Sequence, residues 1–295
     1  MDKSMVFDKS RENRITIYYA NLTELEKSNI VSDKETLSCI VEKVNKQRRN
    51  KILRCKNEKD KLRSLVAGLL LRFGLEQEGI DYEKSEFIYG EHGKPMLLHY
   101  KYRNEDINTQ KGSQKVFFSL THSDDYVACA ISDETIGIDL EQTNRTLFSK
   151  EKEQQLLSMA KRICTQREYV YFLNLPKEKR IKAYVELWTR KESFAKADGR
   201  GLAIGLEQVE VLKEEELEHR TNNPLLQMRR ALSDKDSGFS CQLEQKAKKL
   251  EFVSPFYTCW INENTCMSIY SSKESQNNIA DCFYVNAEQI IFYFK

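Results

Sequence analysis

Residues 136–141 read IGIDLE, and this short stretch decides how the rest of the chain is interpreted. Aliphatic residues alternate with Gly137, Asp139 and Glu141, which predicts a strand with one buried aliphatic face and two carboxylates side by side on the other. Such a pair alone is more often a solvated strand face. Carboxylates this close repel each other unless a cation intervenes. The pair therefore indicates a functional site only in combination with a second charged segment of the chain.

Residues 188–196 read WTRKESFAK and carry a third carboxylate. Trp188, Glu192 and Lys196 recur four residues apart, which places them on one face of a helix that we expect to end at Gly199. A plain surface pair is the alternative for Glu192 and Lys196. Brought together with the strand pair, Glu192 would complete an all-oxygen site that suits Mg²⁺ and leaves room for a phosphate. The combination predicts phosphoryl transfer.

Composition bounds the class of protein. The 295 residues are 40% hydrophobic with a formal net charge of +2, which indicates a globular protein without a global basic field for nucleic acid. The N-terminus is charged and lacks a signal-peptide core, and the apolar runs are too short to cross a bilayer. The 8 cysteines show no Cys-x-x-Cys pair, so we expect neither a zinc site nor a disulfide framework. Scattered thiols of this kind indicate a cytoplasmic location.

Two similar α+β halves are expected, because a strand, helix, strand, strand order occurs before residue 134 and recurs after it. We therefore divide the chain into residues 1–134 and 135–295. The expected strands lie at 15–20, 116–123, 126–131, 206–211 and 256–269; helices at 32–44 and 64–74 and a helical block at 150–198; a basic amphipathic stretch at 46–63; a turn at 90–95; irregular insertions at 101–114 and 213–249; and an apolar tail at 282–294 that docks onto the body.

Four motifs in order resemble the Sfp-type 4'-phosphopantetheinyl transferases, the superfamily that includes holo-acyl-carrier-protein synthases. They are GKP at 93–95, FSLTHS at 118–123, GIDLE at 137–141 and the run at 188–202. The resemblance covers most of the chain. It implies a pseudo-dimer of two α/β halves with coenzyme A in the cleft between them. It also implies transfer of phosphopantetheine from coenzyme A to a serine of an apo acyl, peptidyl or aryl carrier protein, with Mg²⁺ or Mn²⁺.

The resemblance also assigns roles to individual residues. Asp139, Glu141 and Glu192 would hold the metal, and Glu168 would be the general base that takes the proton of the carrier serine. Lys191 or Lys196 would neutralise charge on the pyrophosphate and the departing 3',5'-ADP, with His122 as a further catalytic group. The residues expected to contact coenzyme A are Arg48, Lys51, Arg63, Lys94, Thr121, His122, Lys191 and Lys196. A buried, satisfied histidine is the alternative for His122.

Some features depart from the family pattern. The insertions at 101–114 and 213–249 leave the carrier contacts open, and Ala195 stands where the family has a bulkier residue.

Two other classes of function compete with the transferase. One is a catalytically inactive coenzyme A-binding regulatory module, although an inactive relative would be free to lose carboxylates that repel each other. The other is a nucleic-acid-binding protein built on residues 46–63, but that stretch has no aromatic residue for base stacking. We expect a monomer that binds neither nucleic acid nor membrane.

Overall fold

A computed structural model describes residues 14–26, 33–102, 115–143, 153–212, 248–252, 256–272 and 278–295. Its strands are β1 (Arg14–Asn21), β2 (Glu86–Tyr89), β3 (Pro95–His99), β4 (Phe117–Ser123), β5 (Tyr126–Ser132), β6 (Ile136–Gln142), β7 (Lys248–Phe252), β8 (Phe256–Trp260), β9 (Thr265–Ser271) and β10 (Asn278–Tyr284). Its helices are α1 (Thr23–Glu26), α2 (Lys34–Val41), α3 (Lys46–Arg54), α4 (Glu58–Gln77), α5 (Glu153–Ile163), α6 (Gln166–Asn174), α7 (Lys177–Asp198) and α9 (Ala287–Phe294), with 3-10 turns η2 (Tyr82–Lys84), η5 (Gly201–Ile204) and η6 (Leu206–Gln208). None of these helices combines the length and the apolar character needed to cross a bilayer.

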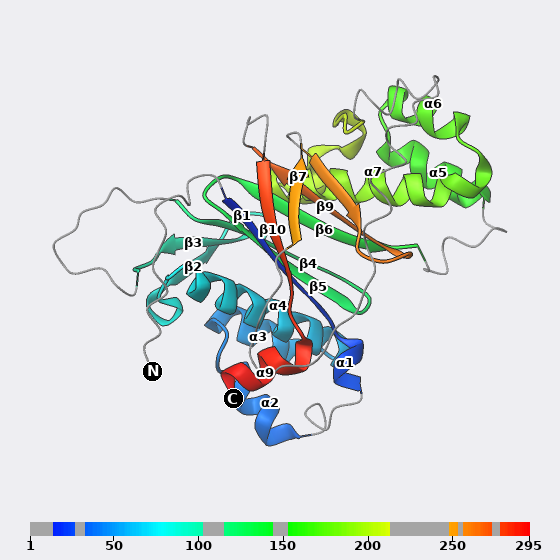
Figure 1. The fold of residues 1–295 in the computed structure, drawn as a ribbon. Helices are drawn as coiled ribbons and strands as arrows, with labels where there is room; N and C mark the ends of the chain where they lie inside the picture. Colours follow the sequence, from blue (N-terminus) through cyan, green and yellow to red (C-terminus); the bar gives the residue numbers. More distant parts are fainter. Residues whose placement is uncertain are drawn as a thin grey trace.

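Two larger sheets and one hairpin organise the described residues (Figure 1). One sheet has the order β4-β5-β1-β10-β7, in which β1 and β10 are parallel and the other neighbours antiparallel. The second is the antiparallel sheet β6-β9-β8, and β2 pairs with β3. Because β10 lies beside β1, the five-stranded sheet takes strands from both sides of residue 134. The division of the chain at that residue stays a prediction.

Three apolar clusters separate the layers. Helix α4 packs with α9 on one face of the five-stranded sheet, where Leu69 and Leu70 contribute to the first cluster. The second cluster lies between the two sheets, and the aliphatic residues Ile136, Ile138 and Leu140 of β6 supply part of it. The third lies on the outer face of the three-stranded sheet under α5, α6 and α7. The result is a helix, sheet, sheet, helix sandwich.

Both faces of β6 are buried, including the face that carries the carboxylates. Asp139 is 6% exposed and Glu141 7% exposed. The cause lies at Gly137, where a Cβ atom would stand 1.8 Å from the backbone oxygen of Ser193 and 2.7 Å from the backbone nitrogen of Ala197. Glycine therefore lets the backbone of α7 lie directly on β6. The solvated-face alternative for the two carboxylates is wrong.

Most predicted elements are confirmed, with shifted ends. The strand at 15–20, the two strands at 116–131 and the helical block to residue 198 all form, and α7 ends at Gly199 in the left-handed conformation with φ 93°. The predicted strand at 206–211 is wrong, because η6 and extended backbone occupy it. The span 256–269 is two strands, since the side chain of Asn262 caps a turn by accepting hydrogen bonds from the backbone of Asn264 and Thr265. Most of both predicted insertions lies outside the described residues.

The tail is confirmed as a docked segment. Strand β10 joins the five-stranded sheet, and α9 contributes Ile290 and Ile291 to the cluster around α4. The seven cysteines of the described residues are free thiols.

The contact at Gly137 gives a direct test of this packing. Gly137→Ala forces a methyl group into backbone atoms that have no side chain to move aside, so α7 must shift. We expect a loss of at least about 3 kcal/mol in the free energy of unfolding, measured by urea denaturation. Gly90→Ala is the matched control, because its Cβ would meet nothing closer than 3.5 Å. Equal stability of the two variants would contradict the packing described.

Candidate active site

The centre of the site is the carboxylate of Asp139 on β6. Its Oδ1 accepts hydrogen bonds from Lys196 Nζ at 2.6 Å and from Thr121 Oγ1 at 3.1 Å. Lys196 Nζ also donates to Thr121 Oγ1 at 2.9 Å, which closes a triangle of polar groups between β4, β6 and α7. Burial raises the pKa of Asp139, and the ammonium of Lys196 opposes that rise.

Hydroxyl groups of β4 bind the open edge of β6. Ser119 Oγ accepts a hydrogen bond from the backbone nitrogen of Ile138 at 3.1 Å, and Thr121 Oγ1 accepts one from Leu140 at 3.3 Å. Ser123 Oγ donates to Glu141 Oε1 at 3.1 Å. These side chains satisfy buried backbone donors that would otherwise lack a partner at the edge of the sheet. The same contacts fix the positions of both β6 carboxylates.

The third carboxylate, Glu192, comes from α7 and is only partly exposed. Its Oε1 is buried and accepts no hydrogen bond from any described residue. Burial and the negative charges of Asp139 and Glu141 raise the pKa of Glu192 to about 7, while Lys196 opposes the shift. A buried carboxylate oxygen without a partner is costly in a folded protein, so it marks a place where a positively charged ligand would be stabilising.

The donor set suits a hard divalent cation. Three carboxylates from β6 and α7 provide only oxygen atoms, which Mg²⁺ prefers, and the unpartnered oxygen of Glu192 is free to ligate it. Across the described ranges, no three Asp, Glu, His or Cys side chains stand close enough to form a closed metal site. Lys196 supplies the positive charge beside Asp139 instead. The residues therefore fit a metal by their chemistry, with Lys196 as the competing cation.

A cavity of about 260 Å³ opens beside this cluster. Its lining combines α3, α4, the turn between β2 and β3, β4 and the end of α7, and none of the described lining residues is a carboxylate. The cationic residues of the lining are Arg48, Lys51, Lys94 and Lys196, with Thr121 and His122 beside them. A pocket lined by cations without a carboxylate is suited to an anion such as a phosphate group.

Arg48 is the most deeply placed of these cations. It is 9% exposed, donates from one guanidinium nitrogen to the backbone oxygen of Ser64 at 3.3 Å, and leaves Nε without a hydrogen-bond partner among the described residues. Burial lowers the pKa of Arg48. A buried guanidinium with a free donor in the pocket lining is a candidate phosphate ligand.

His122 is not the buried, satisfied histidine considered as an alternative. Its side chain lines the pocket and remains exposed to solvent. Partial desolvation and the positive charges of Lys196, Arg63 and Lys51 lower the pKa of His122. The ring is therefore neutral near pH 7 and can donate a hydrogen bond to a phosphate oxygen.

The structure does not bring Glu168 or Lys191 to the pocket. Both side chains are 0% exposed, and Lys191 Nζ lies 2.7 Å from Glu168 Oε2. The backbone nitrogens of Thr165 and Val211 donate to the same carboxylate, and Lys191 donates to the backbone oxygen of Leu206. Their placement does not support the general-base role of Glu168 or the substrate contact of Lys191. The closed pair instead joins α6, α7 and the segment after η6.

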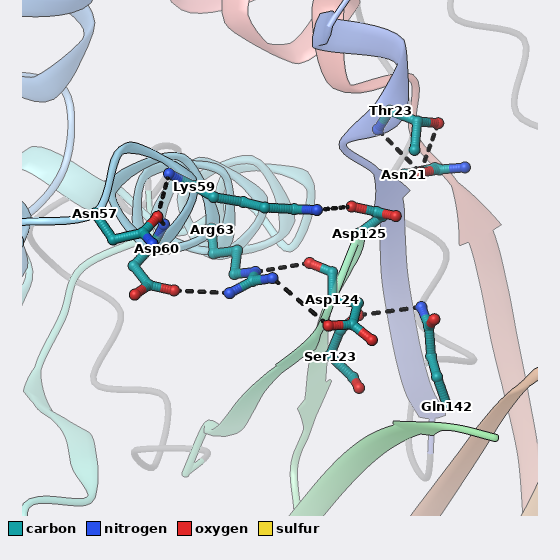
Figure 2. Close-up of polar contacts among 10 residues, drawn as sticks. All are labelled: Asn21, Thr23, Asn57, Lys59, Asp60, Arg63, Ser123, Asp124, Asp125 and Gln142. Atoms are coloured by element: carbon teal, nitrogen blue, oxygen red, sulfur yellow. Dashed lines mark hydrogen bonds and ion pairs between the residues drawn. The ribbon is translucent and has the colours of Figure 1, made fainter. Parts of the chain in front are cut away.

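Arg63 is not among the described residues that line the pocket, and it contacts the turn between β4 and β5 (Figure 2). Its guanidinium donates to the backbone oxygen of Asp124 at 2.6 Å and to Asp60 Oδ1 at 2.7 Å. Lys59 pairs with Asp125 of the same turn at 2.5 Å. Asp124 has φ 45°, in the left-handed region, so these cations support a strained two-residue turn between β4 and β5. The sequence-based assignment of Arg63 to the phosphate stays a prediction.

Sequence reasoning missed the supporting hydroxyl groups of β4. Ser119, Thr121 and Ser123 alternate with apolar or aromatic positions, and that period of two places all three on one face of the strand. Of the three, only Thr121 was expected from the sequence to contact coenzyme A. This alternation of polar residues would have predicted that one face of β4 contacts backbone groups at the edge of another strand.

Comparison with known proteins agrees with this geometry. A family model described as the 4'-phosphopantetheinyl transferase superfamily matches residues 135–244, and one described as 4'-phosphopantetheinyl transferase, N-terminal, matches residues 31–134. The chain belongs to the 4'-phosphopantetheinyl transferase superfamily.

Individual relatives share part of their length with this chain. The 4'-phosphopantetheinyl transferase gsp of Aneurinibacillus migulanus is 30% identical over 58% of this chain and 63% of its own length. The 4'-phosphopantetheinyl transferase HetI of Nostoc sp. is 34% identical over 51% of this chain and 53% of its own length. Sfp of Bacillus subtilis is 28% identical over 57% of this chain and 66% of its own length. The matches thus span about half to two thirds of these relatives.

The raised pKa of Glu192 predicts a pH-dependent gain in stability for Glu192→Gln. The folded protein takes up a proton on Glu192 between its ordinary pKa of 4.5 and about 7, so the wild type loses stability as the pH rises through that window. After allowance for solvent screening, the charge costs about 1–2 kcal/mol. The variant should therefore melt about 2–6 °C above the wild type at pH 8 and close to it at pH 4.

The measurement is thermal unfolding followed by circular dichroism in buffer with a chelator. Glu178→Gln is the control, since Glu178 is exposed in the first turn of α7. A melting difference for Glu192→Gln that is the same at both pH values would sink this account of the carboxylate.

Proposed function

We propose that this protein transfers 4'-phosphopantetheine from coenzyme A to a serine hydroxyl of an apo carrier protein and releases adenosine 3',5'-bisphosphate. The observation that carries the proposal is that the charges of Asp139 and Glu141 act on Glu192 and raise its pKa, beside a pocket whose described lining is cationic. Membership of the superfamily and the names of the relatives support it. The partner would be an acyl, peptidyl or aryl carrier protein.

The chain's own residues would bind and orient the substrate. Arg48 and Lys51 would hold phosphate groups of coenzyme A in the pocket, and neutral His122 would donate to the pyrophosphate. Lys196 would stabilise negative charge that develops on the departing nucleotide. The serine oxygen would attack the β-phosphorus while the bond to adenosine 3',5'-bisphosphate breaks and the serine proton passes to solvent.

A divalent metal completes the proposal. Mg²⁺ or Mn²⁺ held by Asp139, Glu141 and Glu192 would neutralise pyrophosphate charge and align it for displacement. Lys196 holds Asp139 in place and limits repulsion among the carboxylates. We also propose that coenzyme A lies between two α/β halves divided near residue 134, and that the protein acts as a cytoplasmic monomer, as the family resemblance implies.

Mass spectrometry of carrier proteins tests the reaction. An apo acyl carrier protein and an apo peptidyl carrier domain are each incubated with the protein, coenzyme A and Mg²⁺. We expect one of them to gain about 340 Da, the mass of the phosphopantetheine arm. Asp139→Asn and Glu192→Gln should each lower kcat/KM at least about 100-fold, because they remove charge from the metal site while keeping the side-chain shape.

Glu178→Gln serves as the matched control and should transfer at the wild-type rate. Wild-type activity in both Asp139→Asn and Glu192→Gln would contradict the assignment of the carboxylates. Tight binding of coenzyme A without a mass gain on any carrier would favour the inactive binding module instead.

A further inference from the structure

Lys94 crosses from the turn between β2 and β3 to the end of α7. Its Nζ donates to the backbone oxygen of Ala197 at 2.6 Å, and its side chain is about half-buried in the pocket wall. We propose that Lys94 is a positioning residue that clamps the C-terminal end of α7 and so holds Lys196 in the pocket wall and against Asp139. This role differs from the nucleotide contact expected from the sequence.

The end of α7 needs such a donor. The last carbonyls of a helix have no partner within the helix, and their aligned dipoles give that end a partial negative charge. In this 22-residue helix the backbone nitrogen of Gly199 bonds to Ala195 at 3.0 Å, and Lys94 bonds to Ala197. The ammonium therefore satisfies an orphan carbonyl and stabilises the helix dipole with one contact.

The helix terminus is shaped to admit the lysine. Gly199 has φ 93°, and a Cβ atom at this position would stand 3.3 Å from Lys94 Cδ. A side chain here would press on the lysine stem as well as strain the backbone. Arg200 pairs with Asp198 at 2.6 Å on the exposed side, so the nearby carboxylate already has a cation and Lys94 remains on the carbonyl.

The other end of the clamp is anchored. Gly90 and Lys94 close the turn with a backbone hydrogen bond of 2.9 Å, and Phe87 and Leu97 of the paired strands pack into the cluster around α4. Lys94 thus links the cluster on one face of the five-stranded sheet to a helix that packs on the other sheet. Since Lys196 directly precedes Ala197, fraying of this turn would displace the ammonium that contacts Asp139.

Hydrogen exchange in the ligand-free full chain tests the clamp without depending on activity. In Lys94→Met, amides in residues 195–200 should exchange about tenfold faster than in the wild type, because a charge-assisted hydrogen bond at the helix end is lost. Amides of α4 should be unchanged. Lys94→Arg retains a hydrogen-bond donor, so the same amides should exchange more slowly in Lys94→Arg than in Lys94→Met. Lys101→Met, an exposed lysine beyond β3, is the matched control.

Wild-type exchange at residues 195–200 in Lys94→Met would overturn the clamp, and so would equal acceleration in α4 and α7. The effect on turnover rests on the proposed function: Lys94→Met should lower kcat as well as raise the KM for coenzyme A, whereas a residue that only contacts the nucleotide would change KM alone. If no carrier is modified by the wild type, the proposed function fails while the exchange result still decides the clamp.

Discussion

At Gly137 the backbone of β6 meets the backbone of α7 with no side chain between them, and the site depends on that contact. The absence of a Cβ lets the helix descend onto the strand, so that Glu192 and Lys196 approach the face that carries Asp139 and Glu141. The opposite face of β6 is occupied by aliphatic residues packed between two sheets. The strand can therefore not move away from the helix without opening the core.

The close approach of α7 to β6 places negative charges in a partly buried region with little water. Three carboxylates at one junction destabilise each other, and the structure limits the cost with one ammonium from Lys196 and with hydroxyl donors from Thr121 and Ser123. The oxygen of Glu192 that remains without a donor among the described residues shows that this compensation is incomplete. Strain and unsatisfied groups of this kind are typical of functional sites, where ligand binding stabilises what folding alone does not.

Local pattern predicted the elements that carry the site, and long-range pairing decided the rest. Alternation in residues 136–141 predicted β6, and the spacing of Glu192 and Lys196 predicted their shared helical face. Burial of the carboxylates did not follow from that alternation, because it depends on a glycine contact with residues more than 50 positions away. Likewise no local signal places β10 beside β1. The resemblance assigned catalysis to Glu168, but a motif does not reveal that its side chain is sealed against Lys191.

We propose that β6 and α7 together present one divalent-metal site beside the anion pocket. Titration of the full chain with Mn²⁺, followed by electron paramagnetic resonance, measures how many ions bind and how tightly. One specific site per chain should be found in the wild type and in Glu178→Gln, and it should be lost in Glu192→Gln. Undiminished Mn²⁺ binding in Glu192→Gln would contradict this proposal.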